Sequence, residues 1–255
     1  GIYIISIENE VKGWQQYPLF TKEALKLIEI SKWGDFNISN AGGFFDNVNL
    51  VVTATDKPII TDVFVNTTFY DCDLFNAPVD DWDMSMAWYL ASFFGLCDGF
   101  NQPVNSWNTS SFLEVSSMFA GCTVFNQPLD NWDMSNVTDM TGMFNNAIAF
   151  DQPLNMWDTS SNTDTHSMFS SATVFNQPLN LWDMSNVTNI NAMFASATAF
   201  DQDISSWDIR NVTDADNFMW GATLSTANYD LLLVAWEANT PPSSLVIGFG
   251  NSQYS

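Results

Sequence analysis

Hydrophobic residues recur along this chain with a fixed period of 25 residues. Phenylalanine opens each of six repeats, at Phe75, Phe100, Phe125, Phe150, Phe175 and Phe200. Tryptophan follows seven residues after each of them, and a second aromatic residue or methionine follows twelve residues after the tryptophan. A constant period in the twenties is typical of a solenoid, because stacked coils bury together what one coil cannot bury alone.

The pattern inside one repeat predicts one strand and one helix. Residues 137–147 carry apolar side chains at helical spacing, with Thr138 or Asp139 as a cap. Residues 131–135 (NWDMS) alternate, which indicates a short strand with Trp132 and Met134 on one side. We therefore expect an α/β repeat solenoid. Its unit is a leucine-rich-repeat-like right-handed coil with one short parallel strand and one short helix per 25-residue repeat.

The two ends of the chain look like caps on one continuous domain. Residues 1–74 are predicted to form an N-terminal cap with a strand and helix plus two divergent coils, and residues 75–224 form the six regular coils. Residues 225–255 are expected to close the stack. There, Ser225–Ala238 reads as an amphipathic helix with Ser225 as its N-cap, and residues 243–250 read as a strand.

The repeated aromatic residues are predicted to fill the core of the coils. The strict spacing favours burial of Phe125, Trp132, Phe144, Phe150, Trp157, Phe175 and Trp182. An alternative is that the tryptophans form an exposed stripe that stacks on glycans or peptide aromatics. So many bulky residues in one coil also suggest that some aromatics lie outside, as a lateral contact surface.

The three cysteines are also 25 residues apart, at Cys72, Cys97 and Cys122, and Ala147 continues the series. This slot is predicted to hold a small buried side chain, and a free cysteine behaves as one. A disulfide between adjacent coils is the alternative, and the odd count would leave at least one thiol unpaired.

The phrase FNQPLDNWDMSNVTDMTGMF (residues 125–144) and its copies resemble BspA-type leucine-rich-repeat surface proteins, whose repeat also occurs in mycoplasma surface lipoproteins. The flanking phrases SKWGDF, VVTATDKP and TLSTANYDLLLVAWEA match too. The resemblance implies a secreted or cell-surface protein, often one module of a longer chain. It implies adhesion to host or matrix proteins, or cell–cell contact, and it supplies no catalytic residues.

The charge of the chain is strongly negative, −23 at pH 7, and every lysine precedes residue 58. Nucleic acid is excluded as a partner, because its affinity depends on lysine and arginine neutralising phosphates. No apolar run is long enough to span a bilayer, so direct membrane insertion is not expected. Cations or basic partners suit such a surface.

One acidic or amide residue follows the tryptophan of each regular coil, and two positions later comes a serine in five coils and Arg210 in the last. The first column is Asp83, Asn108, Asp133, Asp158, Asp183 and Asp208, and the second includes Ser135, Ser160 and Ser185. On an exposed strand ladder these would be candidate ligand contacts. Their mutual repulsion must be offset, either by hydrogen bonds from adjacent coils and solvent ions, or by calcium at Asp133, Asp158 and Asp183.

The sequence holds no catalytic constellation. The single histidine, His166, has no nucleophile motif with it, which argues against triad chemistry. Apart from the candidate calcium, no cofactor is expected. We expect a non-catalytic extracellular binding or adhesion module. Its partner would be a protein or glycan on another cell or in the matrix, or further copies of itself. The alternative is a structural subunit or segment of a surface filament or viral fibre.

Overall fold

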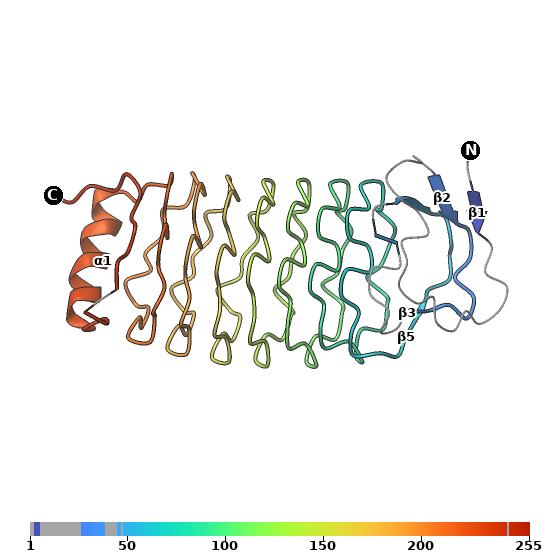
Figure 1. Cartoon of the computed structure of the whole chain (residues 1–255), viewed down its shortest axis with the longest axis horizontal. Helices are drawn as coiled ribbons and strands as arrows, with labels where there is room; N and C mark the ends of the chain where they lie inside the picture. Colours follow the sequence, from blue (N-terminus) through green and yellow to red (C-terminus); the bar gives the residue numbers. More distant parts are fainter. Residues whose placement is uncertain (1–2, 6–26, 39–44, 47, 244) are drawn as a thin grey trace.

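The computed structural model describes residues 3–5, 27–38, 45–46, 48–243 and 245–255. Figure 1 shows a row of coils with short strands at the N-terminal end and one helix at the C-terminal end. Each coil lies beside the coils that precede and follow it in the sequence, so neighbours in space are residues about one repeat apart.

Parallel strands form the N-terminal end. Strands β1 (Tyr3–Ile5), β2 (Leu27–Ile30) and β4 (Asn49–Val52) make one sheet in the order β1-β2-β4, and β3 (Asn37–Ile38) pairs with β5 (Ile59–Ile60). The expected N-terminal strand is confirmed over Tyr3–Ile5. The described part of residues 1–74 contains no helix, and residues 6–26, where the rest of the predicted cap falls, lie outside the described residues.

Isolated parallel bridges join the coils that follow. They run through Phe64, Tyr89, Glu114, Asp139, Asp164, Asn189 and Asp214, one residue per coil and 25 residues apart. The predicted strand at residues 131–135 is wrong, because that segment lies between two tight turns. Trp132 N donates to Leu129 O (3.2 Å), and Val137 N donates to Met134 O (3.0 Å). The paired residue is instead Asp139.

The helix predicted over residues 137–147 is also wrong, since α1 is the sole helix among the described residues. The backbone nitrogens of Met140, Gly142, Phe144 and Asn146 donate to carbonyls of the next coil, at 3.0, 2.7, 2.9 and 2.7 Å. Gly142 (φ 60°) and Asn146 (φ 57°) have left-handed backbone conformations, which cannot continue a right-handed helix. The leucine-rich-repeat-like class and its right-handedness stay predictions.

The aromatic columns lie inside the stack. Phe125, Trp132, Phe144, Phe150, Trp157, Phe175 and Trp182 are all buried, so in these coils the alternative of an exposed tryptophan stripe is wrong. The rings of Trp132 and Trp157 lie nearly parallel with centroids 6.5 Å apart. Each indole nitrogen donates to the preceding coil; that of Trp132 lies 3.0 Å from Val104 O. Tryptophan therefore supplies apolar area and satisfies a buried carbonyl, which phenylalanine could not do.

The three cysteines are buried and free. Each thiol donates to a carbonyl of the preceding coil: Cys72 to Phe45, Cys97 to Phe69 and Cys122 to Phe94, with sulfur–oxygen distances of 2.8, 2.8 and 3.0 Å. Burial raises the pKa of Cys72 and Cys122 well above its usual value. The predicted small-residue slot thus holds thiols, and they are not joined by a disulfide.

Helix α1 (Thr226–Ala238) covers the end of the last coil (Figure 1). The predicted N-cap is confirmed, because the Ser225 side chain accepts from the backbone of Asn228. Trp236 is buried and packs on Phe218, with ring centroids 6.0 Å apart. Of the predicted closing strand, the described residues show a single parallel bridge from Ala215 to Ile247.

Candidate binding surface

The predicted acidic column lies on the outside of the stack. Asp83, Asn108, Asp133, Asp158 and Asp183 are exposed, and Asp208 is half-buried. Each follows a buried tryptophan and precedes a buried side chain, such as Met134 after Asp133. The alternation holds the polar group of every coil toward solvent, so that the column presents one carboxylate or amide per coil.

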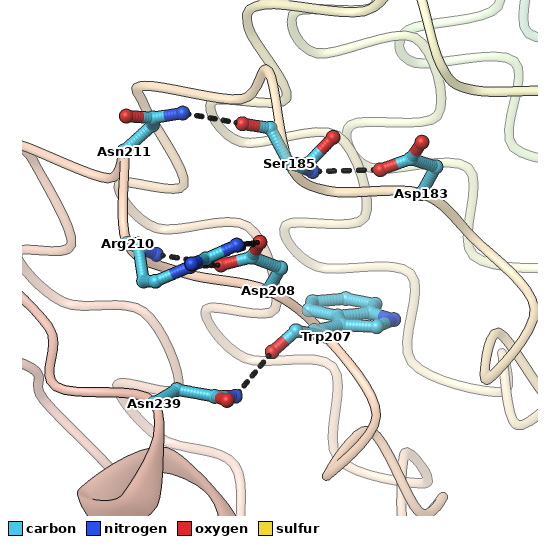
Figure 2. Close-up of polar contacts among 7 residues, drawn as sticks. All are labelled: Asp183, Ser185, Trp207, Asp208, Arg210, Asn211 and Asn239. Carbon is cyan, nitrogen blue, oxygen red and sulfur yellow. Dashed lines mark hydrogen bonds and ion pairs between the residues drawn. The ribbon is translucent and has the colours of Figure 1, made fainter.

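Hydrogen bonds within each coil fix these carboxylates. The Asp133 carboxylate accepts from Ser135 twice, from its backbone nitrogen at 3.0 Å and its hydroxyl at 2.6 Å. Figure 2 shows the corresponding backbone bond at Asp183, which accepts from the nitrogen of Ser185 at 2.9 Å. The expected hydrogen bonds from adjacent coils are therefore replaced by bonds from the residue two positions later, the geometry of an Asx turn.

The same hydrogen bonds favour the ionised carboxyl groups. Hydrogen bonds from the side chain and backbone of Ser160 lower the pKa of Asp158, and those from Ser85 lower the pKa of Asp83. Each bond stabilises the charged form over the neutral form. These column members therefore carry full negative charge at neutral pH.

Arg210 ends the column. Figure 2 shows its guanidinium bound to both carboxylate oxygens of Asp208, with Nε 2.9 Å from Oδ1 and Nη2 2.6 Å from Oδ2. The side-chain hydrogen bond from Arg210 lowers the pKa of Asp208. Arg210 occupies the position where earlier coils carry serine, so the charge of Asp208 is neutralised while Asp133, Asp158 and Asp183 keep theirs.

The serines of the second column are part of the turn that each aspartate begins, so they are not free ligand contacts. Ser135, Ser160 and Ser185 are half-buried, and their carbonyls are covered from the following coil. Asn186 Nδ2 lies 2.7 Å from Ser160 O, and Asn211 Nδ2 lies 2.6 Å from Ser185 O (Figure 2). The repeated phrase NVT was a signal for this contact, which sequence reasoning missed.

A second polar column, the Asn126 ladder, was also missed. It comprises the residue after each opening phenylalanine: Asn76, Asn101, Asn126, Asp151, Asn176 and Asp201. Asn126 Oδ1 accepts from Asp151 N at 3.0 Å and from Gln152 Nε2 at 2.8 Å, both in the next coil. The pairing accounts for the Asn or Asp and for the Gln of the phrase FNQP or FDQP in the middle coils.

Among the residues that the structure describes, no group of three or more histidine, cysteine, aspartate or glutamate side chains is arranged to hold a metal ion. Asp133, Asp158 and Asp183 therefore do not form a metal centre of that kind. Their arrangement offers single fixed charges at regular intervals, which suits positively charged groups on an extended partner.

A family described as "Mycoplasma protein of unknown function, DUF285" matches residues 39–137 and again residues 127–231. The chain belongs to this family. Together the two matches include the bridged residues from Phe64 to Asp214, and they show a repeat protein. Comparison with curated proteins gave no match, and comparison with solved structures gave none. Within the described ranges, no helix has the length and apolar character needed to cross a bilayer.

Proposed function

We propose that this DUF285 chain is a BspA-type, leucine-rich-repeat-like surface protein that acts as a non-catalytic binding or adhesion module outside the cell. Its partner is a protein with basic side chains, on another cell or in the matrix. The observation that carries this proposal is the column of exposed carboxylates at Asp133, Asp158 and Asp183, each fixed by its own coil.

The mechanism is electrostatic and repetitive. Neighbouring coils of a parallel ladder lie about 5 Å apart, so lysines or arginines along an extended segment can meet several carboxylates at once. Each exposed ion pair contributes little, about 0–1 kcal/mol, but several act together on a stiff surface. Complementary charge also speeds encounter with the partner.

The proposal is tested with beads that carry the chain, on layers of cultured epithelial cells and on wells coated with a lysine-rich peptide. The variant Asp133→Asn, Asp158→Asn, Asp183→Asn keeps the shape of each side chain and its ability to accept a hydrogen bond. Bead retention should fall several-fold relative to the unchanged chain.

The matched control is Asp73→Asn, Asp98→Asn, Asp130→Asn, which removes the same number of charges at other exposed positions. It should retain the beads nearly as well as the unchanged chain. Equal losses from the two triple variants would show that net charge matters and the column does not, and retention unaffected by the column variant would refute the proposal.

A second candidate role is a structural segment of a surface filament. The observation that favours it is the outer side of α1, where Leu231 and Val234 are 53% and 71% exposed although the helix caps the stack. Electron microscopy of the purified chain distinguishes the two roles, because polymers would support the structural role and discrete particles the binding role.

A further inference from the structure

A group of large apolar side chains lies exposed near the N-terminal end of the bridged edge. We call Phe64, Met86, Trp88 and Tyr89 the aromatic patch. Phe64, Met86 and Trp88 are 40%, 48% and 42% exposed, and Tyr89 is half-buried. Exposed apolar groups of this kind on a soluble surface indicate an interaction site.

Phe64 and Tyr89 lie against each other, and Met86 and Trp88 precede Tyr89 in the same coil. Phe64 and Tyr89 are paired in a parallel bridge, and their rings stack with centroids 4.6 Å apart. Trp88 lies between two half-buried apolar residues of the adjacent coils. Its backbone nitrogen donates to Val63 O (2.9 Å), and its carbonyl accepts from Leu113 N (2.8 Å). The patch therefore extends over two successive coils, and Leu113 of the third coil lies beside it.

The next coil has Leu113 at the position of Trp88, but the coils after it carry polar residues at both positions. Where this coil has Met86 and Trp88, the coils two and four repeats on have Asn136 with Thr138, and Asn186 with Thr188. Thr138 and Thr188 are exposed, and their hydroxyls donate to carbonyls of the preceding coil. The fold accepts polar residues here, so nothing in the coil itself requires Trp88 or Met86.

The surroundings of the patch are acidic. Asp62 lies two residues before Phe64 in the chain, and Glu114 is bridged to Tyr89; both are half-buried. In the sequence, no lysine or arginine occurs between Lys57 and Arg210. Lys57 is paired with Asp81 at 3.4 Å. Among the described residues, no ion pair is formed by Asp62 or Glu114, so a partner on this patch meets apolar rings and carboxylates together.

We propose that the aromatic patch anchors a basic peptide segment of the partner, one in which apolar side chains alternate with lysine or arginine. The apolar side chains pack on Trp88 and the Phe64–Tyr89 pair, while the cations face Asp62 and Glu114. This inference rests on the proposed binding function and names the residues that hold the partner most tightly. Tryptophan and tyrosine dominate such contacts because they bury large areas at little entropic cost.

The test uses a fluorescent peptide of alternating lysine and leucine, whose affinity for the purified chain is measured by polarisation. The variant Met86→Asn, Trp88→Thr installs the residues of the later coils and changes no charge. The control is Leu181→Asn, another exposed apolar residue, which takes the residue found at Asn131. Far-UV circular dichroism and thermal unfolding establish that both variants are folded.

The patch variant is expected to weaken peptide binding about tenfold or more, and the control to leave it unchanged. A peptide with glutamate in place of lysine should not bind. Equal affinity of the patch variant and the unchanged chain would overturn the inference, as would patch-dependent binding of an uncharged oligosaccharide without binding of the basic peptide.

The outcome also separates this inference from the proposed function. If the column variant at Asp133, Asp158 and Asp183 loses bead adhesion while the patch variant keeps it, the binding function stands and the patch inference fails. If beads that carry the chain are not retained on cells or coated wells and the chain does not bind the peptide, both the binding function and the patch inference fail.

Discussion

The side-chain oxygen of Asn126 lies 3.0 Å from the backbone nitrogen of Asp151 in the following coil. The same oxygen accepts from Gln152, so one side chain satisfies two donors of its neighbour. The contact recurs along the stack: Asn101 receives the corresponding bonds from Asn126 and Gln127. Each coil thereby holds the next through a polar side chain as well as through the aromatic core.

Replacement of Asn126 by alanine is expected to destabilise the chain by about 1–2 kcal/mol, because two inter-coil hydrogen bonds are lost. The measurement is chemical denaturation followed by circular dichroism. Asn126→Asp is the matched control, since Asp151 fills this position in the next coil and accepts the same bonds. If alanine at position 126 costs no more than aspartate does, the ladder contributes nothing to stability.

Asn162 gives a prediction in the opposite direction. It is wholly buried at the position that valine fills in the coils on either side, Val137 and Val187, and neither of its amide atoms has a partner in the protein. Asn162→Val should stabilise the chain by about 1–3 kcal/mol, because burying an unpaired polar group costs that much. The reciprocal change Val187→Asn should destabilise it. The prediction holds if the denaturation midpoint rises for Asn162→Val and falls for Val187→Asn. An unchanged or lower midpoint for Asn162→Val would contradict it.

Asp201 connects the last coil to helix α1. Its carboxylate accepts from Ser225 N at 2.8 Å and from Asn228 Nδ2 at 2.9 Å. Partial burial tends to raise the pKa of Asp201, but the hydrogen bonds from Ser225 and Asn228 outweigh it and lower the pKa. A lowered pKa means that this stabilisation is complete above the unfolded value of about 3.9 and is lost as pH falls through the folded value.

Helix α1 should therefore exchange its amide hydrogens faster below about pH 4, after correction for the intrinsic exchange rate, than at pH 6. In Asp201→Asn this dependence should disappear, because the amide keeps an acceptor oxygen and does not titrate. Hydrogen exchange of peptides from residues 225–239 measures the effect. The same acid response in the asparagine variant would mean that Asp201 is not its source.

The thiols of Cys72, Cys97 and Cys122 should not react with a disulfide reagent while the chain is folded. They are buried and donate to carbonyls, and burial raises the pKa of Cys72 and Cys122, so the reactive thiolate is scarce. All three should react after unfolding in guanidinium. Rapid labelling of the folded chain would contradict the placement of this column in the core.

The period of the stack and its buried columns could be predicted from the sequence. Trp132, Trp157 and Trp182 recur without a gap, and a position repeated in every coil has the same surroundings in each. The elements inside a coil could not be predicted, because Val137, Met140, Phe144 and Ala147 have the spacing of a helix. The same spacing arises here from turns whose alternate backbone nitrogens point to the next coil.

Within residues 137–147, glycine and asparagine indicated that the segment would not form a helix. Gly142 and Asn146 are four residues apart, and Gly121 and Asn217 occupy equivalent positions in other coils with positive φ. Glycine and asparagine adopt this conformation most readily. The polar contacts between coils, such as Asn186 with Ser160, were missed for a different reason: side-chain partners 26 residues apart cannot be identified from one repeat considered alone.

The most direct test of the binding function is the salt dependence of association. The chain is passed over a surface that carries a lysine-rich peptide, and the association rate is measured between about 50 and 200 mM salt, where screening of exposed charges increases. Two triple variants of equal net charge are compared. The column variant is Asp133→Asn, Asp158→Asn, Asp183→Asn, and the control is Asp73→Asn, Asp98→Asn, Asp130→Asn. The account predicts that the column variant associates several-fold more slowly and with a weaker salt dependence, while the control resembles the unchanged chain. Identical rates for the two variants would contradict it.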